Sequence, residues 1–154
     1  MILADYLIVI DVQTDYLSQD KNYNSYDLIS AINNKISIYP TDKVIYVVNR
    51  FFWELDRKKK KLVPDLKKVS AYVYEKRHAS CLTNDDLREF LWKHSTKSIE
   101  FVGLDGNYCI SASIKAVSNR GYNAIVDLNC IGVKNHNKFK KTLKKWRSAK
   151  VVIE

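Results

Sequence analysis

Three residues that can carry out covalent and proton-transfer chemistry stand at or shortly after the ends of apolar runs. Asp11 ends the run YLIVID, Lys76 ends SAYVYEK, and Cys109 follows SIEFVG after a short loop. A cysteine is a nucleophile only as its thiolate; a carboxylate can accept the thiol proton and an ammonium favours the thiolate. Taken singly, each residue has an ordinary alternative: a helix cap, a solvated lysine, a small core side chain. The chemistry therefore depends on whether the fold brings the three together.

The sequence around Cys109 places its thiol in the first turn of a helix. The loop GLDGN leads into the helix-like segment YCISASIKAVSNRG, which Gly121 closes at its C-terminal end. A helix N-terminus carries partial positive charge and unpaired N–H groups, which favour a thiolate and can bind an oxyanion. Gly103 and Gly106 allow the loop to turn tightly. This position suits a reactive cysteine.

Apolar runs and helix-like segments alternate along the chain. Strands that are apolar throughout are covered on both faces, and their alternation with helices predicts right-handed crossovers in a parallel sheet. We expect a single α/β domain over residues 1–154, with three α/β/α layers around a six-stranded parallel sheet. The expected strands are residues 6–11, 43–49, 70–76, 98–103, 122–128 and 150–154. The expected helices are residues 26–37, 83–94 and 108–121, and a basic helix before the last strand.

A parallel sheet of this class binds ligands outside the carboxyl ends of its strands. Asp11, Lys76 and Cys109 all fall at such ends, so we expect their side chains to meet at one edge of the sheet.

Composition limits the class of protein. Hydrophobic residues make up 46% of the chain, and no apolar run approaches the ~20 residues that a membrane span requires. The first residues lack the features of a signal peptide. The three cysteines have no CxxC spacing, which argues against a disulfide framework or a zinc ribbon and favours a cytoplasmic protein. We interpret Cys81 and Cys130 as structural.

The net charge of +9 comes largely from two segments, residues 57–61 and 134–150. An anionic substrate, a nucleic acid or an acidic partner would suit such charge, and so would a solvated surface. In the second segment Phe139, Leu143 and Trp146 recur at helical spacing, so one face packs and the lysines face water. A nucleic-acid interface needs basic and aromatic residues on one face; because the two basic segments are far apart, we rank it last.

Residues 49–64 combine Phe51, Phe52 and Trp53 with Arg50 and the basic run RKKKK. Two interpretations remain open with equal weight. Phe51 and Trp53 could form the aromatic wall of a pocket with a cationic rim, or the aromatic residues could pack in the core or in a subunit interface.

Three blocks of the sequence resemble the isochorismatase-like cysteine hydrolases, the superfamily that includes the nicotinamidases. The blocks are LIVIDVQTDYL, YEKRHASCLTNDDLREFL and VGLDGNYCISASIKAVSNRGYNAIVDLNC, in the order that the family has them. They cover most of the chain. The resemblance implies hydrolysis of a small amide-like substrate through a thioester, without a cofactor, in a homo-oligomer.

The resemblance also implies a role for each matching residue. Cys109 would be the nucleophile, Asp11 the general base and Lys76 the third member of the triad. The backbone N–H groups of Asp105 and Cys109 would hold the oxyanion, with a cis peptide bond at Leu104–Asp105. Gln13 and Tyr16 would help to line the pocket.

The sequence departs from the nicotinamide-hydrolysing members of the family. Those members hold a metal with histidines after the second strand, whereas VVNRFFWELDRKKKKLVP has none. His78, His94 and His136 are scattered without ligand spacing, so we expect no metal site. Asp105 also places an acid beside the oxyanion loop.

The alternative function is a catalytically silent protein of this fold that binds or sequesters a small anionic ligand.

Overall fold

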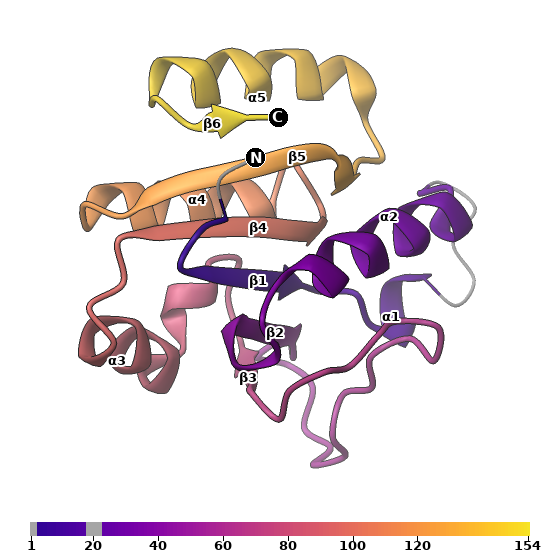
Figure 1. Ribbon diagram of the computed structural model, residues 1–154. Coiled ribbons are helices and arrows are strands. Elements are labelled where there is room, and N and C mark those ends of the chain that lie inside the picture. Colours follow the sequence, from indigo (N-terminus) through magenta and orange to yellow (C-terminus); the bar gives the residue numbers. More distant parts are fainter. Residues whose placement is uncertain (1–2, 18–22) are drawn as a thin grey trace.

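The computed structural model describes residues 3–17 and 23–154, and its centre is a six-stranded parallel sheet in the order β3-β2-β1-β4-β5-β6 (Figure 1). All five strand pairings are parallel. The fold class predicted from the sequence is confirmed. The strands are β1 Tyr6–Ile10, β2 Val44–Asn49, β3 Val73–Lys76, β4 Ser98–Leu104, β5 Asn123–Gly132 and β6 Val152–Ile153.

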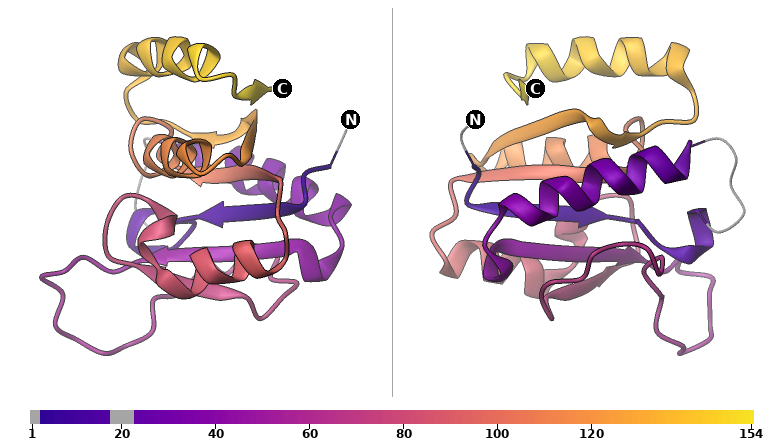
Figure 2. Two further views of the ribbon diagram at one scale, coloured as in Figure 1. Left: turned by 90° about the vertical axis from the view of Figure 1, so that its left-hand side faces the viewer. Right: turned by 45° about the vertical axis from the view of Figure 1, so that its right-hand side comes forward.

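Helices cover both faces of the sheet, giving three layers (Figure 2). On one face, α2 packs with Leu7 and Val9 of β1; on the other, α3, α4 and α5 pack with Ile8 and Ile10. The helices are α1 Thr14–Leu17, α2 Ser25–Ile38, α3 Asp85–Lys93, α4 Cys109–Asn119 and α5 His136–Ser148, with short 3₁₀ turns at Thr41–Lys43 and Cys81–Thr83. No helix in these ranges is both long and apolar enough to cross a membrane.

The local sequence explains where several elements begin and end. Every residue of β1 is buried, as expected for a strand covered on both faces. The Asn84 side chain caps α3 by accepting a hydrogen bond from the Leu87 N–H. Gly121 follows α4 with a φ of 85°, the left-handed conformation typical of a helix C-terminus. Trp146 is buried on α5 while the lysines of that helix are exposed, which confirms its amphipathic packing.

Three details differ from the sequence-based expectation. β5 continues to Gly132 beyond an irregularity in its pairing with β4, because the polar residues around Asn129 interrupt the apolar pattern but not the strand. β3 begins only at Val73, and the short helix α1 was not predicted.

At the carboxyl edge of the sheet, the backbones of β1 and β4 approach each other closely at Gly103. A Cβ on Gly103 would lie 2.0 Å from the carbonyl oxygen of Ile10, so only glycine lets β4 pair with β1 at this point. The strand order reverses between β1 and β4, which is where ligands bind in open α/β sheets. Asp11 follows β1 here, and α4 begins at Cys109 after β4.

Candidate active site

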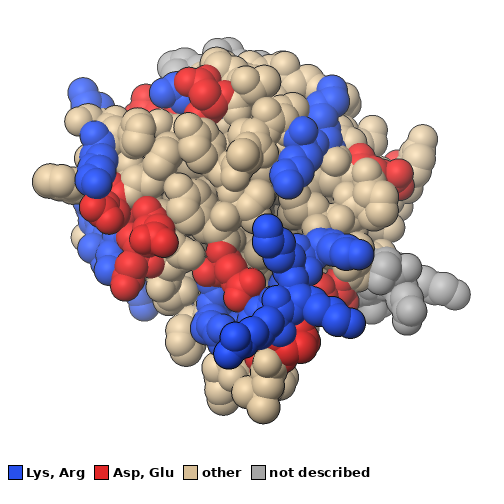
Figure 3. Space-filling model, turned by 90° about the horizontal axis from the view of Figure 1, so that it is seen from below, with Lys and Arg blue, Asp and Glu red and all other residues tan. Residues whose placement is uncertain are grey.

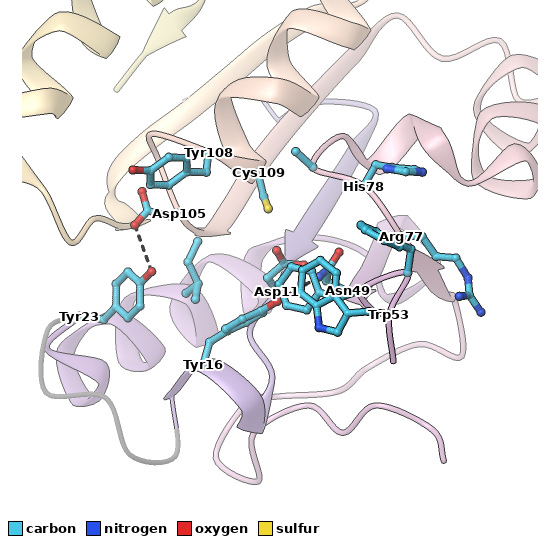
Figure 4. Close-up of a pocket in the computed structure, with 14 residues that line it drawn as sticks. Asp11, Tyr16, Tyr23, Asn49, Trp53, Arg77, His78, Asp105, Tyr108 and Cys109 are labelled. Carbon is cyan, nitrogen blue, oxygen red and sulfur yellow. Dashed lines mark hydrogen bonds between the residues drawn. The ribbon is translucent and has the colours of Figure 1, made fainter. Parts of the chain in front are cut away.

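Asp11, Lys76 and Cys109 meet at the carboxyl edge of the sheet, as their positions in the sequence predicted. Figure 4 shows Asp11 and Cys109 beside the cavity at this edge. The Nζ of Lys76 lies 3.2 Å from Asp11 Oδ2 and 3.3 Å from Cys109 Sγ. It also donates to Asn49 Oδ1 at 3.1 Å. A lysine ammonium has three N–H donors and no acceptor, so these three contacts use its whole hydrogen-bonding capacity. Lys76 is thereby fixed between the acid and the thiol.

Burial controls the protonation of the cluster. Burial raises the pKa of the Asp11 carboxyl, and interactions with Lys76 and Cys109 offset only part of the rise. Burial and the negative charge of Asp11 raise the pKa of the Cys109 thiol to about 12, although Lys76 acts in the opposite direction. The thiolate that the sequence led us to expect is therefore not the resting form at neutral pH. Asp11 is the acid next to this thiol, and a carboxyl group in its ionised form can accept a thiol proton.

The loop before Cys109 presents backbone donors to the same space. The Leu104–Asp105 peptide bond is cis, which confirms that expectation. The N–H groups of Asp105 and Cys109 have no hydrogen-bond acceptor among residues 3–17 and 23–154. Neighbouring N–H groups are used within the loop, since those of Tyr108 and Ile110 both donate to the Asp105 carbonyl. Two free donors beside a thiol form the arrangement needed to bind an oxyanion.

The Asp105 carboxylate is engaged by its own surroundings. It accepts hydrogen bonds from the backbone N–H of Asn107 at 2.8 Å, from the Tyr23 hydroxyl at 3.0 Å and from the backbone N–H of Lys134 at 3.2 Å. Figure 4 shows this side chain directed toward Tyr23 rather than toward Cys109. The Asp105 side chain therefore joins this loop to the residue Tyr23 before α2 and to the segment before α5.

A cavity of about 390 Å³ opens beside the Cys109 thiol. Phe, Trp and Tyr side chains form a large part of its wall. Phe51 and Trp53 stack with their ring centres 4.4 Å apart, and Tyr16 extends toward Asp11 (Figure 4). The lining residues are Asp11, Tyr16, Tyr23, Asn49, Phe51, Phe52, Trp53, Arg77, His78, Ala79, Leu104, Asp105, Tyr108 and Cys109.

The structure decides between the pocket and the core for the aromatic residues of the loop after β2. Phe51, Phe52 and Trp53 are 36%, 66% and 60% exposed and line the cavity, so packing in the core is wrong. Phe52 packs edge-on against Trp53, so the three rings form one contiguous aromatic cluster that lines the cavity.

Some cations of this loop form ion pairs within the protein, and the others are exposed on its surface. Arg50 is buried and holds the loop by bonding Glu75, Asp56 and the Lys58 carbonyl, so it is not part of a cationic rim. Lys60 pairs with Asp15 at 2.8 Å and with Glu54. The remaining cations of the run, Arg57, Lys58, Lys59 and Lys61, are exposed. Figure 3 shows basic side chains gathered on the lower face of the molecule, with acidic side chains among them.

Gln13 supports the site by hydrogen-bonding the backbone of Asn49. Its side chain is fully buried, accepts from the Asn49 N–H at 2.7 Å and donates to the Asn49 carbonyl at 3.0 Å. Gln13 is not part of the cavity wall in which sequence reasoning placed it; Asn49 is. The sequence analysis also missed Tyr23, His78 and Tyr108 as lining residues.

The side chains present do not fit a metal centre. Within the described residues, no group of three or more His, Cys, Asp and Glu side chains could hold an ion. After β2 the cavity is lined by the rings of Phe51, Phe52 and Trp53, which cannot ligate a metal.

The other two cysteines lie in different surroundings from Cys109. Cys81 is fully buried, its backbone N–H donates to Ser113 Oγ, and burial raises its thiol pKa to about 11. Cys130 is buried in the core on the α2 side of the sheet. Neither lines the cavity beside Cys109.

Comparison with known proteins places this geometry in a family. The isochorismatase domain model matches residues 5–153, and the chain therefore belongs to the isochorismatase family. No curated protein sequence matches.

Solved structures agree on the fold. The pyrazinamidase/nicotinamidase from Streptococcus mutans UA159 is 16% identical with a TM-score of 0.77, covering 97% of this chain and 99% of its own. The N-carbamoylsarcosine amidase from Thermoplasma acidophilum is 16% identical with a TM-score of 0.79, covering 99% and 96%. The pyrazinamidase of Pyrococcus horikoshii in complex with zinc is 16% identical with a TM-score of 0.80, covering 97% of each chain. At these identities the likeness establishes the fold.

Proposed function

We propose that this protein is a cysteine hydrolase that cleaves the carbon–nitrogen bond of a small amide or carbamoyl compound. The observation that carries the proposal is the contact of Lys76 with both Asp11 and Cys109 at the base of a cavity. Family membership and the amidases among the structural neighbours support the reaction class.

In the first half of the reaction the sulfur of Cys109 attacks the carbonyl carbon as its proton passes to Asp11. The backbone N–H groups of Asp105 and Cys109 donate to the oxyanion of the tetrahedral intermediate. The carbon–nitrogen bond then breaks, and the leaving amine takes the proton from Asp11. The product of this half is a thioester on Cys109 and a free amine or ammonia.

In the second half a water molecule replaces the amine. Asp11 takes a proton from the water, whose oxygen attacks the thioester carbonyl. Collapse of the second tetrahedral intermediate releases the acid, and the Cys109 sulfur recovers its proton from Asp11. Lys76 contacts both groups and stabilises the negative charge as it passes between the carboxylate and the sulfur. The cycle uses side chains of this chain alone, and we propose that it requires no metal.

The test is ammonia or amine release from a panel of small carboxamides and carbamoyl compounds. Cys109→Ser should lower turnover by about a thousandfold or more, because a site arranged for a thiol offers no base strong enough for a serine hydroxyl. Asp11→Asn should lower turnover similarly while ligand binding persists. Cys130→Ala, a cysteine away from the cavity, is the matched control and should keep turnover.

The same panel separates the enzyme from the silent binding protein. A silent protein would bind members of the panel without releasing product, and Cys109→Ser would change neither binding nor the absence of turnover. That outcome would replace the hydrolase by the alternative function.

A further inference from the structure

Asn49, at the end of β2, is hydrogen-bonded to three side chains of the active site: Lys76, Tyr16 and Gln13. Its side-chain Oδ1 accepts from Lys76 at 3.1 Å, and its Nδ2 donates to the Tyr16 hydroxyl at 3.0 Å. Its backbone N–H donates to the Gln13 side-chain amide, and its backbone carbonyl accepts from the same amide. Asn49 is only 4% exposed, so its side chain has little freedom to rearrange.

Lys76 determines the direction of both hydrogen bonds in the series that runs from Lys76 through Asn49 to Tyr16. An ammonium can only donate, so the side-chain atom of Asn49 that faces it must be the oxygen. The amide nitrogen of Asn49 must then face Tyr16 and donate to the hydroxyl oxygen. The hydroxyl hydrogen of Tyr16 cannot be used in that contact and must point elsewhere.

The Tyr16 hydroxyl has no acceptor for that hydrogen within residues 3–17 and 23–154. The residue lines the cavity, and its ring runs toward Asp11 (Figure 4). Burial raises its pKa, which keeps the hydroxyl protonated and able to donate. Tyr16 is half-buried at the cavity, so its hydroxyl hydrogen is open to an acceptor that a bound ligand supplies.

We propose that Asn49 is a positioning residue that aims Lys76 at the Cys109 sulfur and turns the Tyr16 hydroxyl into a hydrogen-bond donor for substrate. A ligand of this cavity would then place a hydrogen-bond acceptor against the Tyr16 hydroxyl. The inference rests on the proposed function because it assumes that the ligand of the cavity is a substrate. Its test, however, needs no turnover.

The first arm of the test measures how Asn49 acts on the thiol. The probe is iodoacetamide, and the readout is the second-order rate constant for alkylation of Cys109 at about pH 9, where the rate follows the thiolate fraction. Asn49→Leu should slow alkylation by about three- to tenfold, since each unit of rise in the thiol pKa is a factor of ten. Lys76→Ala should slow it in the same direction. Asn119→Leu, an exposed asparagine on α4, is the control and should leave the rate unchanged.

The second arm measures the donor at Tyr16. The probes are N-phenylchloroacetamide and its three pyridyl isosteres, which differ only in one ring nitrogen. Rates for Cys109 are divided by those for free glutathione to remove intrinsic reactivity. At least one pyridyl isomer should react faster than the phenyl compound, and Tyr16→Phe should abolish that preference. Tyr26→Phe, an exposed tyrosine, is the control.

Asn49→Asp tests the link between the two arms. The new carboxylate would accept the Tyr16 hydrogen, so the pyridyl preference should vanish although Tyr16 is intact. The proposal that the Tyr16 hydroxyl donates to the ligand is wrong if the pyridyl preference survives in Asn49→Asp or in Tyr16→Phe. It is also wrong if the unmodified protein shows no such preference. An alkylation rate that falls in Lys76→Ala but not in Asn49→Leu overturns the positioning role. Asn49→Ser serves in place of Asn49→Leu if the latter does not fold. Failure of amide turnover with both arms intact would overturn the proposed function alone.

Discussion

Two buried lysines in this molecule make similar ion pairs with different consequences. Lys35 on α2 lies 2.9 Å from Glu100, 3.2 Å from Asp127 and 3.8 Å from Glu154. Lys76 at the end of β3 has one acid, one amide and one thiol as its neighbours. The first lysine joins α2, β4, β5 and the last residue of the chain, whereas the second faces a cavity.

The surplus of acid around Lys35 makes that cluster purely structural. Burial lowers the pKa of Lys35, but Glu100 and Asp127 outweigh it and the net shift is upward. Tyr39 donates a further hydrogen bond to Glu100 at 2.5 Å. At Lys76 the acid is single and its own pKa is raised, so a proton can move on and off it. The two lysines therefore differ in their neighbours: Lys35 has three acids, whereas Lys76 has one acid and shares its ammonium with the Cys109 thiol.

The largest effect should come from breaking the Lys35 cluster. Lys35→Met leaves the buried Glu100 carboxylate without its cation and should lower the free energy of unfolding by about 3–5 kcal/mol, measured by urea denaturation. Lys93→Met, which removes an exposed lysine paired with Glu89, should change it by no more than about 0.5 kcal/mol. Under native conditions Cys109 alkylation should be the same in both variants. A slowed alkylation in folded Lys35→Met would show that the two clusters are coupled.

A smaller effect should follow titration of the Asp11 pair. The pKa of Asp11 lies above its usual 3.8, and the base is active only when ionised. Turnover should therefore fall as the pH drops through this raised pKa, by about tenfold per unit below it. Lys76→Ala removes a charge that lowers this pKa, so the acid limb of the residual activity should move to higher pH, while Lys93→Ala should not move it. An acid limb at the same pH in Lys76→Ala would separate Lys76 from the base.

Much of the site was accessible from the sequence because its residues stand at strand ends. The apolar runs before Asp11, Lys76 and Cys109 determine the sheet edge on which they meet, and parallel topology does the rest. Gly103 could be recognised as a turn glycine, although its contact with Ile10 depends on strand order.

What the sequence did not reveal depends on burial and on contacts between distant segments. Asn49 looks like an ordinary strand end, and only the structure brings it to Lys76 and Tyr16. Arg50 looks like part of a basic rim, yet its partner Glu75 lies in β3. The thiol pKa of Cys109 depends on how much water its surroundings exclude, which residue type alone does not determine.

The most direct test of the account is to look for the covalent intermediate on Cys109. The protein is mixed with each compound of the amide and carbamoyl panel, quenched rapidly in acid, and mapped by peptide mass spectrometry. The account predicts an acyl mass on the peptide that contains Cys109 with every compound that is turned over, released by hydroxylamine and missing in Cys109→Ser. Turnover that continues in Cys109→Ser, or acyl mass found on Cys81 or Cys130 instead, would contradict it.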